Sequence, residues 1–270
     1  MELALHTLTC FKHIETIEPI TAGLSSHCYK INADKKYYFV KQLTTKNEAI
    51  VGLSAASNSI GPAVVYHDQH WLVTEYIDGI NLTLSSHSLD QKIKIACQLM
   101  AKCHQLTAKP LELSPKKISH DLIRNSHFSS QQQITLLHLA NQLIPRLKST
   151  NKMVCCHGDL NFSNLLIDKT ENAYLVDFEC ACIASAEYDL AMFIAVNVLT
   201  KKQASMIIDQ YQYYSSIKID LSLVDAFLSF CYILNGLWYA QAYNNTKDSK
   251  FSYLAKQQWQ HVPALVSMAL

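Results

Sequence analysis

The sequence is poor in charge. Only 17% of its 270 residues are charged, whereas an average soluble domain has roughly 25%. The 23 lysines and arginines nearly balance the 22 aspartates and glutamates, so the formal net charge is +1. A chain without a basic or acidic excess is not expected to bind nucleic acid or an anionic membrane surface. With 49% hydrophobic residues, it can bury a large core and leaves little sequence for disordered tails.

The sequence also lacks a linker rich in proline, glycine or serine, and it contains only six glycines and six prolines. A chain of this length is compatible with one domain or with two closely packed ones. Because no flexible segment separates independent units, we predict a globular protein with two lobes that share one interface.

No cysteine pair has the Cys-x-x-Cys spacing, and the number of cysteines, nine, is odd. The chain opens with Met1-Glu2-Leu3 and lacks the basic and apolar regions of an export signal. We therefore expect free thiols in a reducing cytoplasm. A metal centre at Cys155-Cys156-His157 and Cys180-x-Cys182 is disfavoured, because these spacings do not match the usual zinc knuckles.

One long segment, residues 226–243, carries no charge. Its length would allow a short membrane span. However, Asn235, Gly236 and Gln241 lie inside it, and no basic flank precedes it. We therefore predict a helix that is buried among other helices, and no membrane partner.

The first third of the sequence has the pattern of a small antiparallel sheet. Between Ile14 and Thr74, short runs rich in β-branched and aromatic residues alternate with turn residues. Residues 47–56 interrupt this pattern with apolar side chains at helical spacing. We predict one helix within a sheet lobe.

The remainder of the chain reads as mostly helical. Residues 91–106 and 134–147 have the pattern of amphipathic helices, and the sequence from Leu190 to the C-terminus contains few helix breakers. Residues 152–178 return to short strands around a loop. The fold class that we predict is therefore α+β.

The loop within this strand region carries the chemistry. It reads His157-Gly158-Asp159-Leu160-Asn161-Phe162-Ser163-Asn164, and after a short apolar strand Asp177 follows. A hairpin would bring Asp159, Asn164 and Asp177 to the same ligand. Phosphoryl transfer from ATP needs two oxygen ligands for Mg²⁺ and a separate carboxylate that accepts the proton of the attacking hydroxyl. Asn164 and Asp177 suit the metal, and Asp159 suits the base. The alternative is an ordinary hairpin loop with turn-forming side chains.

The pattern H-x-D-x4-N followed by D-F-x resembles the catalytic loop and metal-binding segment of kinases, with Gly158 and Glu179 where protein kinases carry arginine and glycine. Together with Ala186-Glu187-Tyr188-Asp189-Leu190-Ala191, it resembles the superfamily of choline/ethanolamine kinases and aminoglycoside phosphotransferases. This resemblance implies a two-lobed protein-kinase-like fold. Residues 1–77 would form the nucleotide-binding β-sheet lobe, and residues 78–270 the larger helical lobe with the catalytic loop and the acceptor site.

The resemblance further implies ATP and Mg²⁺ as cofactors. Lys41 ends an apolar strand, where kinase-like folds use a lysine to bind the α- and β-phosphates. Glu48 is its candidate partner, although an acidic residue that simply begins a helix would look the same. The remaining candidate nucleotide contacts are a phosphate-covering loop with Gly23, Ser25 and Ser26, and an interlobe hinge whose backbone at Glu75, Tyr76 and Ile77 would pair with adenine. An ordinary hairpin turn would read like the first of these segments.

Aromatic residues are concentrated near the C-terminus, where 12 of the 26 follow residue 195. Aromatic faces attract quaternary ammonium groups. Trp238 matches a tryptophan that walls the choline pocket of choline kinases, whereas Asn235 stands where the eukaryotic members carry a second one. The candidate acceptor-binding residues are Asn161, Glu179, Tyr188, Trp238, Tyr243 and Tyr253. Core packing is the alternative for the aromatic ones, and Glu179 and Asp189 could instead brace the catalytic loop.

We predict an ATP-dependent small-molecule kinase that phosphorylates the hydroxyl of a small cationic alcohol, with choline first and ethanolamine or thiamine as other acceptors. A thiamine kinase or an aminoglycoside phosphotransferase-like enzyme is the alternative. Few carboxylates follow residue 195, which disfavours a polycationic aminoglycoside. A non-catalytic nucleotide-binding pseudokinase is less favoured, because Lys41, Asp159, Asn164 and Asp177 are all present. The sequence indicates no oligomeric state.

Overall fold

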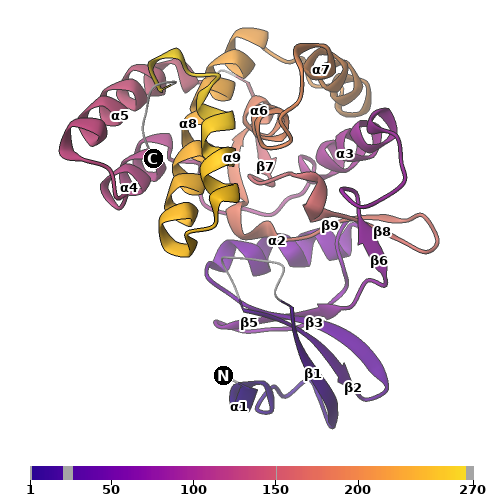
Figure 1. The fold of residues 1–270 in the computed structure, drawn as a ribbon. Coiled ribbons are helices and arrows are strands. Elements are labelled where there is room, and N and C mark those ends of the chain that lie inside the picture. Colours follow the sequence, from indigo (N-terminus) through magenta and orange to yellow (C-terminus); the bar gives the residue numbers. More distant parts are fainter. Residues whose placement is uncertain (1, 21–26, 150, 266–270) are drawn as a thin grey trace. The chain divides into compact units, whose positions relative to one another are not determined.

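The structure, a computed structural model, describes residues 2–20, 27–149 and 151–265. The chain forms two compact units, one of Met1–Leu111 with Phe162–Cys182 and the other of Glu112–Asn161 with Ile183–Leu270. The first unit is built around an antiparallel sheet and the second is mostly helical (Figure 1). The predicted α+β fold class is therefore confirmed, whereas the lobe boundary at residue 77 stays a prediction.

The sheet of the first unit has the strand order β1-β2-β3-β5-β4, and all of its neighbouring strands are antiparallel. The strands are β1 (Ile14–Ile20), β2 (Cys28–Ala33), β3 (Lys36–Gln42), β4 (Val64–His67) and β5 (Trp71–Glu75). The register places Cys28, Lys41 and Leu72 side by side, so their side chains share one face of the sheet. The other face forms a core with residues at and just after the helix α1 (Glu2–Leu5).

The predicted helix in this lobe is α2 (Lys46–Ser57). It packs on the face of the sheet that carries Lys41, since a Cβ added at Gly52 would lie 3.9 Å from Leu72 Cδ2. The only acidic residue in its first turn is Glu48, where a negative charge suits the helix dipole. The helix thus brings Glu48 to the face of the sheet that carries Lys41.

A second antiparallel sheet of the first unit uses residues from distant parts of the chain. Its order is β6-β8-β9, with β6 (Gly79–Asn81), β8 (Leu165–Asp168) and β9 (Ala173–Leu175). The turn between β8 and β9 is closed by Asp168, which accepts hydrogen bonds from the backbone N–H groups of Thr170 and Asn172. The hairpin therefore carries Asn164 at its entry and Asp177 after its exit.

The helix α3 (Leu89–Cys103) completes the first unit and begins with a capping box between Ser88 and Gln91. The second unit contains most of the helices and one pair of short strands. Its elements are α4 (Pro115–Arg124), α5 (Ser130–Leu143), η1 (Ile144–Leu147), β7 (Met153–Cys156), β10 (Cys182–Ser185), α6 (Ala186–Val196), α7 (Lys201–Ser215), α8 (Leu221–Thr246), α9 (Ser249–Trp259) and η4 (Pro263–Leu265). Strand β10 begins at the last residue of the first unit and pairs with β7. The strands β4, β6 and β10 and the helices α1 and α4 have no counterpart in the sequence analysis.

Helix α8 contains the uncharged segment. Among the described residues it is the one helix that is long and apolar enough to cross a membrane, and 56% of its most apolar window is buried. A core helix passes the same test of length and composition, so this is weak support for a span. Within α8, Gly236 lets the buried indole of Trp259 approach the helix backbone closely.

We expect Gly236→Ala to lower the free energy of unfolding by about 1–3 kcal/mol, measured by urea denaturation. The added Cβ would overlap the ring of Trp259, which is only 1% exposed and has no room to move. Gly52→Ala is the matched control, because its Cβ would make an ordinary contact with Leu72 and the protein should become slightly more stable. Equal shifts for the two variants would contradict the close packing at Gly236.

Candidate functional site

Lys41 is buried at the centre of a charged cluster within the first unit. Its ammonium donates to Glu48 Oε1 at 2.8 Å, to Asp177 Oδ1 at 2.5 Å and to Glu179 Oε2 at 3.2 Å. We call these four residues the Lys41 cluster. The two side chains suggested as partners by the sequence, Lys41 and Glu48, thus form an ion pair, and Glu179, which was predicted to touch the acceptor, also contacts Lys41.

The backbone explains how residues so far apart in sequence meet. Strand β3 and helix α2 supply Lys41 and Glu48, while Asp177 and Glu179 follow strand β9. Asp177 has φ 69° and ψ 65°, a left-handed conformation that aspartate tolerates better than most residues. This turn ends β9 and leads into the short helix η3 (Phe178–Cys180), which carries Glu179.

The cluster has three carboxylates for one ammonium. Burial lowers the pKa of Lys41, but the charges of Glu48 and Asp177 raise this pKa by more, so the net shift is upward. Burial also raises the pKa of Glu48 to about 7, although the nearby Lys41 lowers it. Among the described residues, Glu48 Oε2 is buried without a hydrogen-bond partner. The site therefore has acceptor capacity to spare for a cation.

The carboxylates of the cluster fit a divalent metal. One oxygen from each of Glu48, Asp177 and Glu179 lies within 4.8 Å of the others. Hard cations such as Mg²⁺ prefer such oxygen ligands. Asn164, the other predicted ligand, is buried at the end of η2 (Phe162–Asn164), and its carbonyl accepts a hydrogen bond of 3.0 Å from Val176 N. Asn164 is therefore tied to the backbone next to Asp177, while the closeness of Glu48 and Glu179 to Asp177 was not expected from the sequence.

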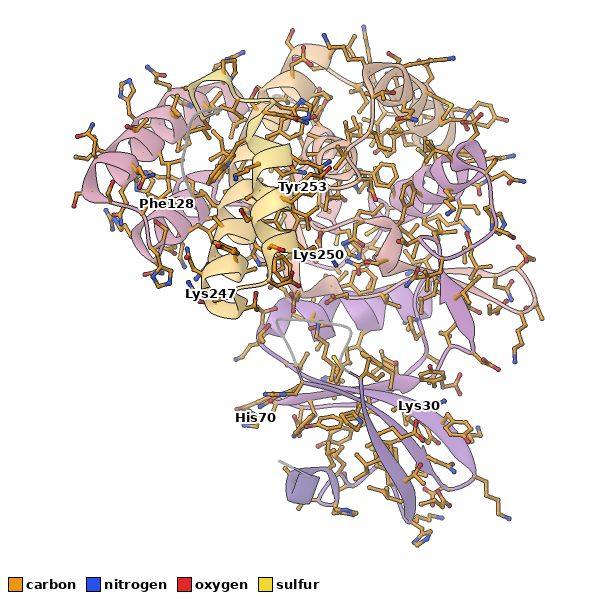
Figure 2. The ribbon with its side chains drawn as sticks, in the orientation of Figure 1. Lys30, His70, Phe128, Lys247, Lys250 and Tyr253 are labelled. Atoms are coloured by element: carbon orange, nitrogen blue, oxygen red, sulfur yellow. The ribbon has the colours of Figure 1, made fainter. Side chains whose placement is uncertain are left out.

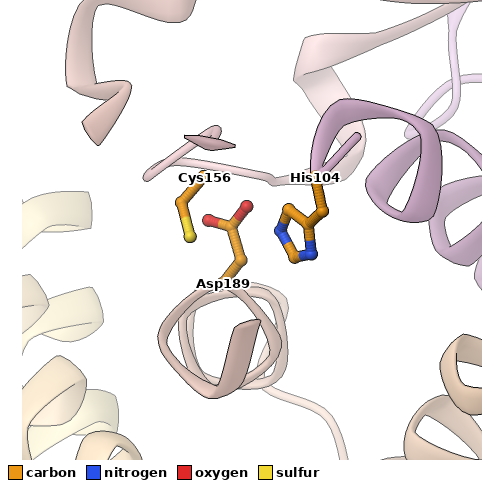
Figure 3. A group of neighbouring side chains, drawn as sticks. All are labelled: His104, Cys156 and Asp189. Carbon is orange, nitrogen blue, oxygen red and sulfur yellow. The ribbon is translucent and has the colours of Figure 1, made fainter. Parts of the chain in front are cut away.

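The part of the predicted catalytic loop around Asp159, up to Asn161, belongs to the second unit. Asn161 Nδ2 donates to both carboxylate oxygens of Asp159 at 3.3 Å. The backbone N–H groups of His157 and Gly158 donate to the two oxygens of Asp189 at 2.7 and 2.8 Å. Asp189 is fully buried on α6 and reaches toward Cys156, the last residue of β7 (Figure 3). Asp189 thus braces the predicted catalytic loop, the role that burial favours over contact with a ligand.

The predicted convergence of Asp159 with Lys41, Asn164 and Asp177 joins residues of the two units. The structure describes each unit by itself, so this convergence stays a prediction. Within the first unit, Lys41 and Asp177 are in contact, and Asn164 is linked to the residue before Asp177.

The remaining predicted nucleotide contacts have different outcomes. Gly23, Ser25 and Ser26 lie outside the described residues. In the predicted hinge, the N–H groups of Glu75 and Tyr76 already donate to Ala63 O at 2.9 Å and Tyr37 O at 3.1 Å. Within the described chain, the N–H of Ile77 has no such partner. Of the N–H groups in this segment, only that of Ile77 is therefore available to adenine, and the predicted backbone pairing at Glu75, Tyr76 and Ile77 stays a prediction.

The sequence analysis missed Phe39. It lies two residues before Lys41 on β3, so its side chain shares the face of Lys41, and it is half-buried. The flat ring faces the same side of the sheet as the lysine that would bind phosphates. The signal that could have identified Phe39 is an aromatic residue two positions before a lysine on the same strand.

The aromatic residues predicted to wall the acceptor site separate into exposed and buried ones. Trp238 is 43% exposed on α8 and meets Tyr239 and Phe251 edge-on, with ring centroids 5.3 and 6.3 Å apart. Tyr253 is exposed on α9 (Figure 2). Tyr188 is 4% exposed and packs edge-on against Phe227, so it is a core residue and not an accessible wall.

Two further residues of this region differ from the expectation. The ring of Tyr243 already faces a cation, because the ammonium of Lys247, next to the end of α8 (Figure 2), lies 5.7 Å from its centroid. Tyr239, which the sequence analysis did not single out, lies within reach of the charge of Asp159. Burial raises the pKa of Tyr239, and the negative charge of Asp159 raises it further. Tyr239 is thus an aromatic residue of this region whose pKa the charge of Asp159 affects.

Comparisons with known proteins identify a family and several structures with a similar fold. The model of the phosphotransferase enzyme family matches residues 16–224. A curated relative, an uncharacterized protein of Metamycoplasma hominis, is 22% identical over 151 residues, or 56% of this chain. The match spans 30% of the length of that relative.

Solved structures share the fold at low sequence identity. The choline kinase LicA from Streptococcus pneumoniae has a TM-score of 0.73 at 15% identity, covering 96% of this chain and 98% of that one. A choline/ethanolamine kinase family protein from Mesorhizobium loti has a TM-score of 0.68 at 19% identity, with 94% and 88% covered. The spectinomycin phosphotransferase APH(9)-Ia has a TM-score of 0.61 at 16% identity, with 92% and 90% covered.

Proposed function

Because the chain belongs to the phosphotransferase enzyme family, we propose that it is a kinase that transfers the γ-phosphate of ATP to the hydroxyl of a small cationic alcohol, choline first. The observation that carries this proposal is the Lys41 cluster. A lysine buried among carboxylates of α2 and of the segment after β9 suits the binding of nucleotide phosphates together with a divalent cation. An ion pair that served only the protein surface would be exposed, whereas the side chains of Lys41 and Glu48 are buried.

In the proposed reaction, Lys41 would bind the α- and β-phosphates, and Asn164 and Asp177 would hold Mg²⁺. Glu179, whose carboxylate lies within 4.8 Å of that of Asp177, would be a further oxygen ligand. When bound, the metal neutralises negative charge on the phosphates. Phe39 packs against the base, and the free N–H of Ile77 donates to it. These residues all belong to the first unit, which would therefore form the nucleotide site.

The acceptor side of the reaction uses the second unit. Asp159 accepts the proton of the attacking hydroxyl, and Asn161 fixes the orientation of that carboxylate through its two hydrogen bonds. The half-exposed ring of Trp238 offers its face to a quaternary ammonium group. In this proposal the hydroxyl of the bound alcohol reaches Asp159, whose charge acts on Tyr239, the neighbour of Trp238 on α8.

Thiamine is the second candidate acceptor, because it combines a positive charge, a primary alcohol and a ring that stacks on aromatic side chains. An aminoglycoside phosphotransferase-like activity is disfavoured by the small number of carboxylates after residue 195. A cytoplasmic location remains part of the proposal, since the free cysteines suit a reducing compartment.

The proposal is tested by measuring ATP turnover with choline, ethanolamine, thiamine, homoserine and kanamycin. We expect choline to have the highest kcat/KM. Asp159→Ala should reduce kcat about 100-fold while leaving nucleotide binding largely unchanged, because it removes the base but no group of the first unit. Turnover that does not depend on any of these acceptors, or that survives in Asp159→Ala, would contradict the proposal.

Trp238→Ala should raise the KM for choline about 5-fold to 10-fold with little change in kcat, because it removes a cation–π contact used in binding. Tyr213→Ala is the matched control, since Tyr213 is an aromatic residue of the same unit that is 79% exposed. If both variants change KM equally, Trp238 does not wall the acceptor site.

A further inference from the structure

The first unit contains a cavity apart from the Lys41 cluster. Its volume is about 610 Å³, which lies within the range of small-molecule sites, about 300–1,000 Å³. The last turn of α2, the end of β5, helix α3 and the β8–β9 hairpin supply its walls. No residue of the Lys41 cluster lines it, whereas Ile77, whose N–H is proposed to donate to the base, does. We call it the rear cavity, because it is separate from that cluster.

The rear cavity lies where β5 ends. Leu72 is paired with Lys41, so Leu72 and Thr74 share the face of Lys41, while Glu75 belongs to the opposite face. Glu75 lines the rear cavity, and Thr74 does not. The cavity therefore lies at the end of β5, where Glu75 meets the last turn of α2, and apart from the four residues of the Lys41 cluster.

The chemistry of the rear cavity combines an apolar floor with charges of both signs. Its floor includes Leu99 and Ile167, which are both buried. Of its charged side chains, Glu171 is already paired with His87 Nε2 at 3.3 Å. Glu75 and Lys102 form no ion pair or side-chain hydrogen bond in the described part of the chain. One anion and one cation thus remain available beside an apolar surface.

We propose that the rear cavity binds a small zwitterion. A cationic group of this ligand pairs with Glu75, a carboxylate or phosphate group pairs with Lys102, and the short carbon frame between them lies on Leu99 and Ile167. The side-chain amides of Gln98 and Asn172, which also line the cavity, supply further hydrogen bonds.

The position of the cavity links its occupant to the nucleotide site. Ala56 lines it from the last turn of α2, the helix whose first turn carries Glu48. Tyr174 lines it from β9, three residues before Asp177. A ligand that holds these two elements together restrains Glu48 and Asp177, and should raise kcat/KM for ATP about 5-fold, a typical strength of coupling between two sites. This rate effect rests on the proposed function, whereas binding itself does not.

Titration calorimetry on the full chain tests the proposal, with the nucleotide site filled by AMP-PNP. The probes are phosphocholine, a zwitterion with a phosphate, and glycine betaine, a zwitterion with a carboxylate. Methyl phosphate is the anion without a cation. We expect one of the two zwitterions to bind at least about 10-fold more tightly than methyl phosphate, and the stronger one identifies the anionic group.

Lys102→Glu tests whether the zwitterion binds in the rear cavity. Lys102 lines this cavity and is exposed on α3, so the substitution reverses the charge that would pair with the anionic group of the ligand. Lys94→Glu is the matched control on the exposed side of the same helix and outside the cavity. We expect Lys102→Glu to weaken the affinity for the zwitterion at least about 10-fold and Lys94→Glu to leave this affinity unchanged, with equal basal turnover in both variants.

The proposal is overturned if neither zwitterion binds, if Lys102→Glu binds the zwitterion like the wild type, or if AMP-PNP competes with the zwitterion. Because calorimetry needs no acceptor, it decides these points even if the chain phosphorylates none.

Discussion

Asp177→Asn is expected to reduce the kcat for ATP turnover at least about 1,000-fold, the largest effect on activity that the structure predicts. The carboxylate of Asp177 contacts the ammonium of Lys41 at 2.5 Å and is a proposed metal ligand. An asparagine has nearly the same shape but no charge, so it would weaken the hold on the cation and leave Lys41 less well neutralised. Steady-state kinetics measures the loss, and circular dichroism verifies that the fold is retained.

Asp78→Asn is the matched control for this substitution. Asp78 also contacts a lysine at 2.5 Å, but both it and Lys169 have side chains at least 75% exposed. Exposed ion pairs contribute little to stability, about 0–1 kcal/mol, and none of the proposed chemistry uses this one. If Asp177→Asn retains the same turnover as Asp78→Asn, the Lys41 cluster is not the phosphate site.

Asp189→Ala is expected to lower the free energy of unfolding by about 3–5 kcal/mol, the largest effect on stability. The carboxylate is completely buried and accepts the backbone N–H groups of both His157 and Gly158. Removing it leaves two buried donors without this acceptor at the start of the predicted catalytic loop. Urea denaturation followed by circular dichroism measures the change, and turnover should fall as well, because Asp159 follows this segment directly.

Two further variants make this prediction specific. Asp189→Asn keeps one acceptor oxygen but turns an NH₂ group toward a backbone N–H, so its stability should lie between those of Asp189→Ala and the wild type. Asp225→Ala removes an exposed aspartate from α8 in the same unit and should change stability by less than about 0.5 kcal/mol. A similar loss for Asp189→Ala and Asp225→Ala would show that the brace does not stabilise the loop.

The local patterns of the sequence were sufficient to predict much of the secondary structure of the first unit. Period-two runs of β-branched and aromatic residues correctly predicted four of the strands of its main sheet, and helical spacing predicted α2. The strand β4 was missed because its four residues, Val64–His67, are too few for a periodic pattern. The helix α4 begins at Pro115 after a polar stretch and was missed for a similar reason.

The residue types of the proposed nucleotide site were also predictable, but their contacts were not. Lys41, Glu48, Asn164 and Asp177 were identified from motif and spacing. That Glu179 joins the same lysine follows from the left-handed turn at Asp177, which spacing alone does not reveal.

By itself, the sequence determined the α+β fold class, the kinase-like motif and the family, because each of these depends on patterns within short stretches of chain. Tertiary structure alone decided which side chains are accessible. It buried Tyr188 against Phe227, used the N–H groups of Glu75 and Tyr76 within the fold and placed the carboxylate of Asp189 against the backbone of the predicted catalytic loop. Burial and hydrogen bonding depend on partners that are distant in sequence, so no local pattern records them.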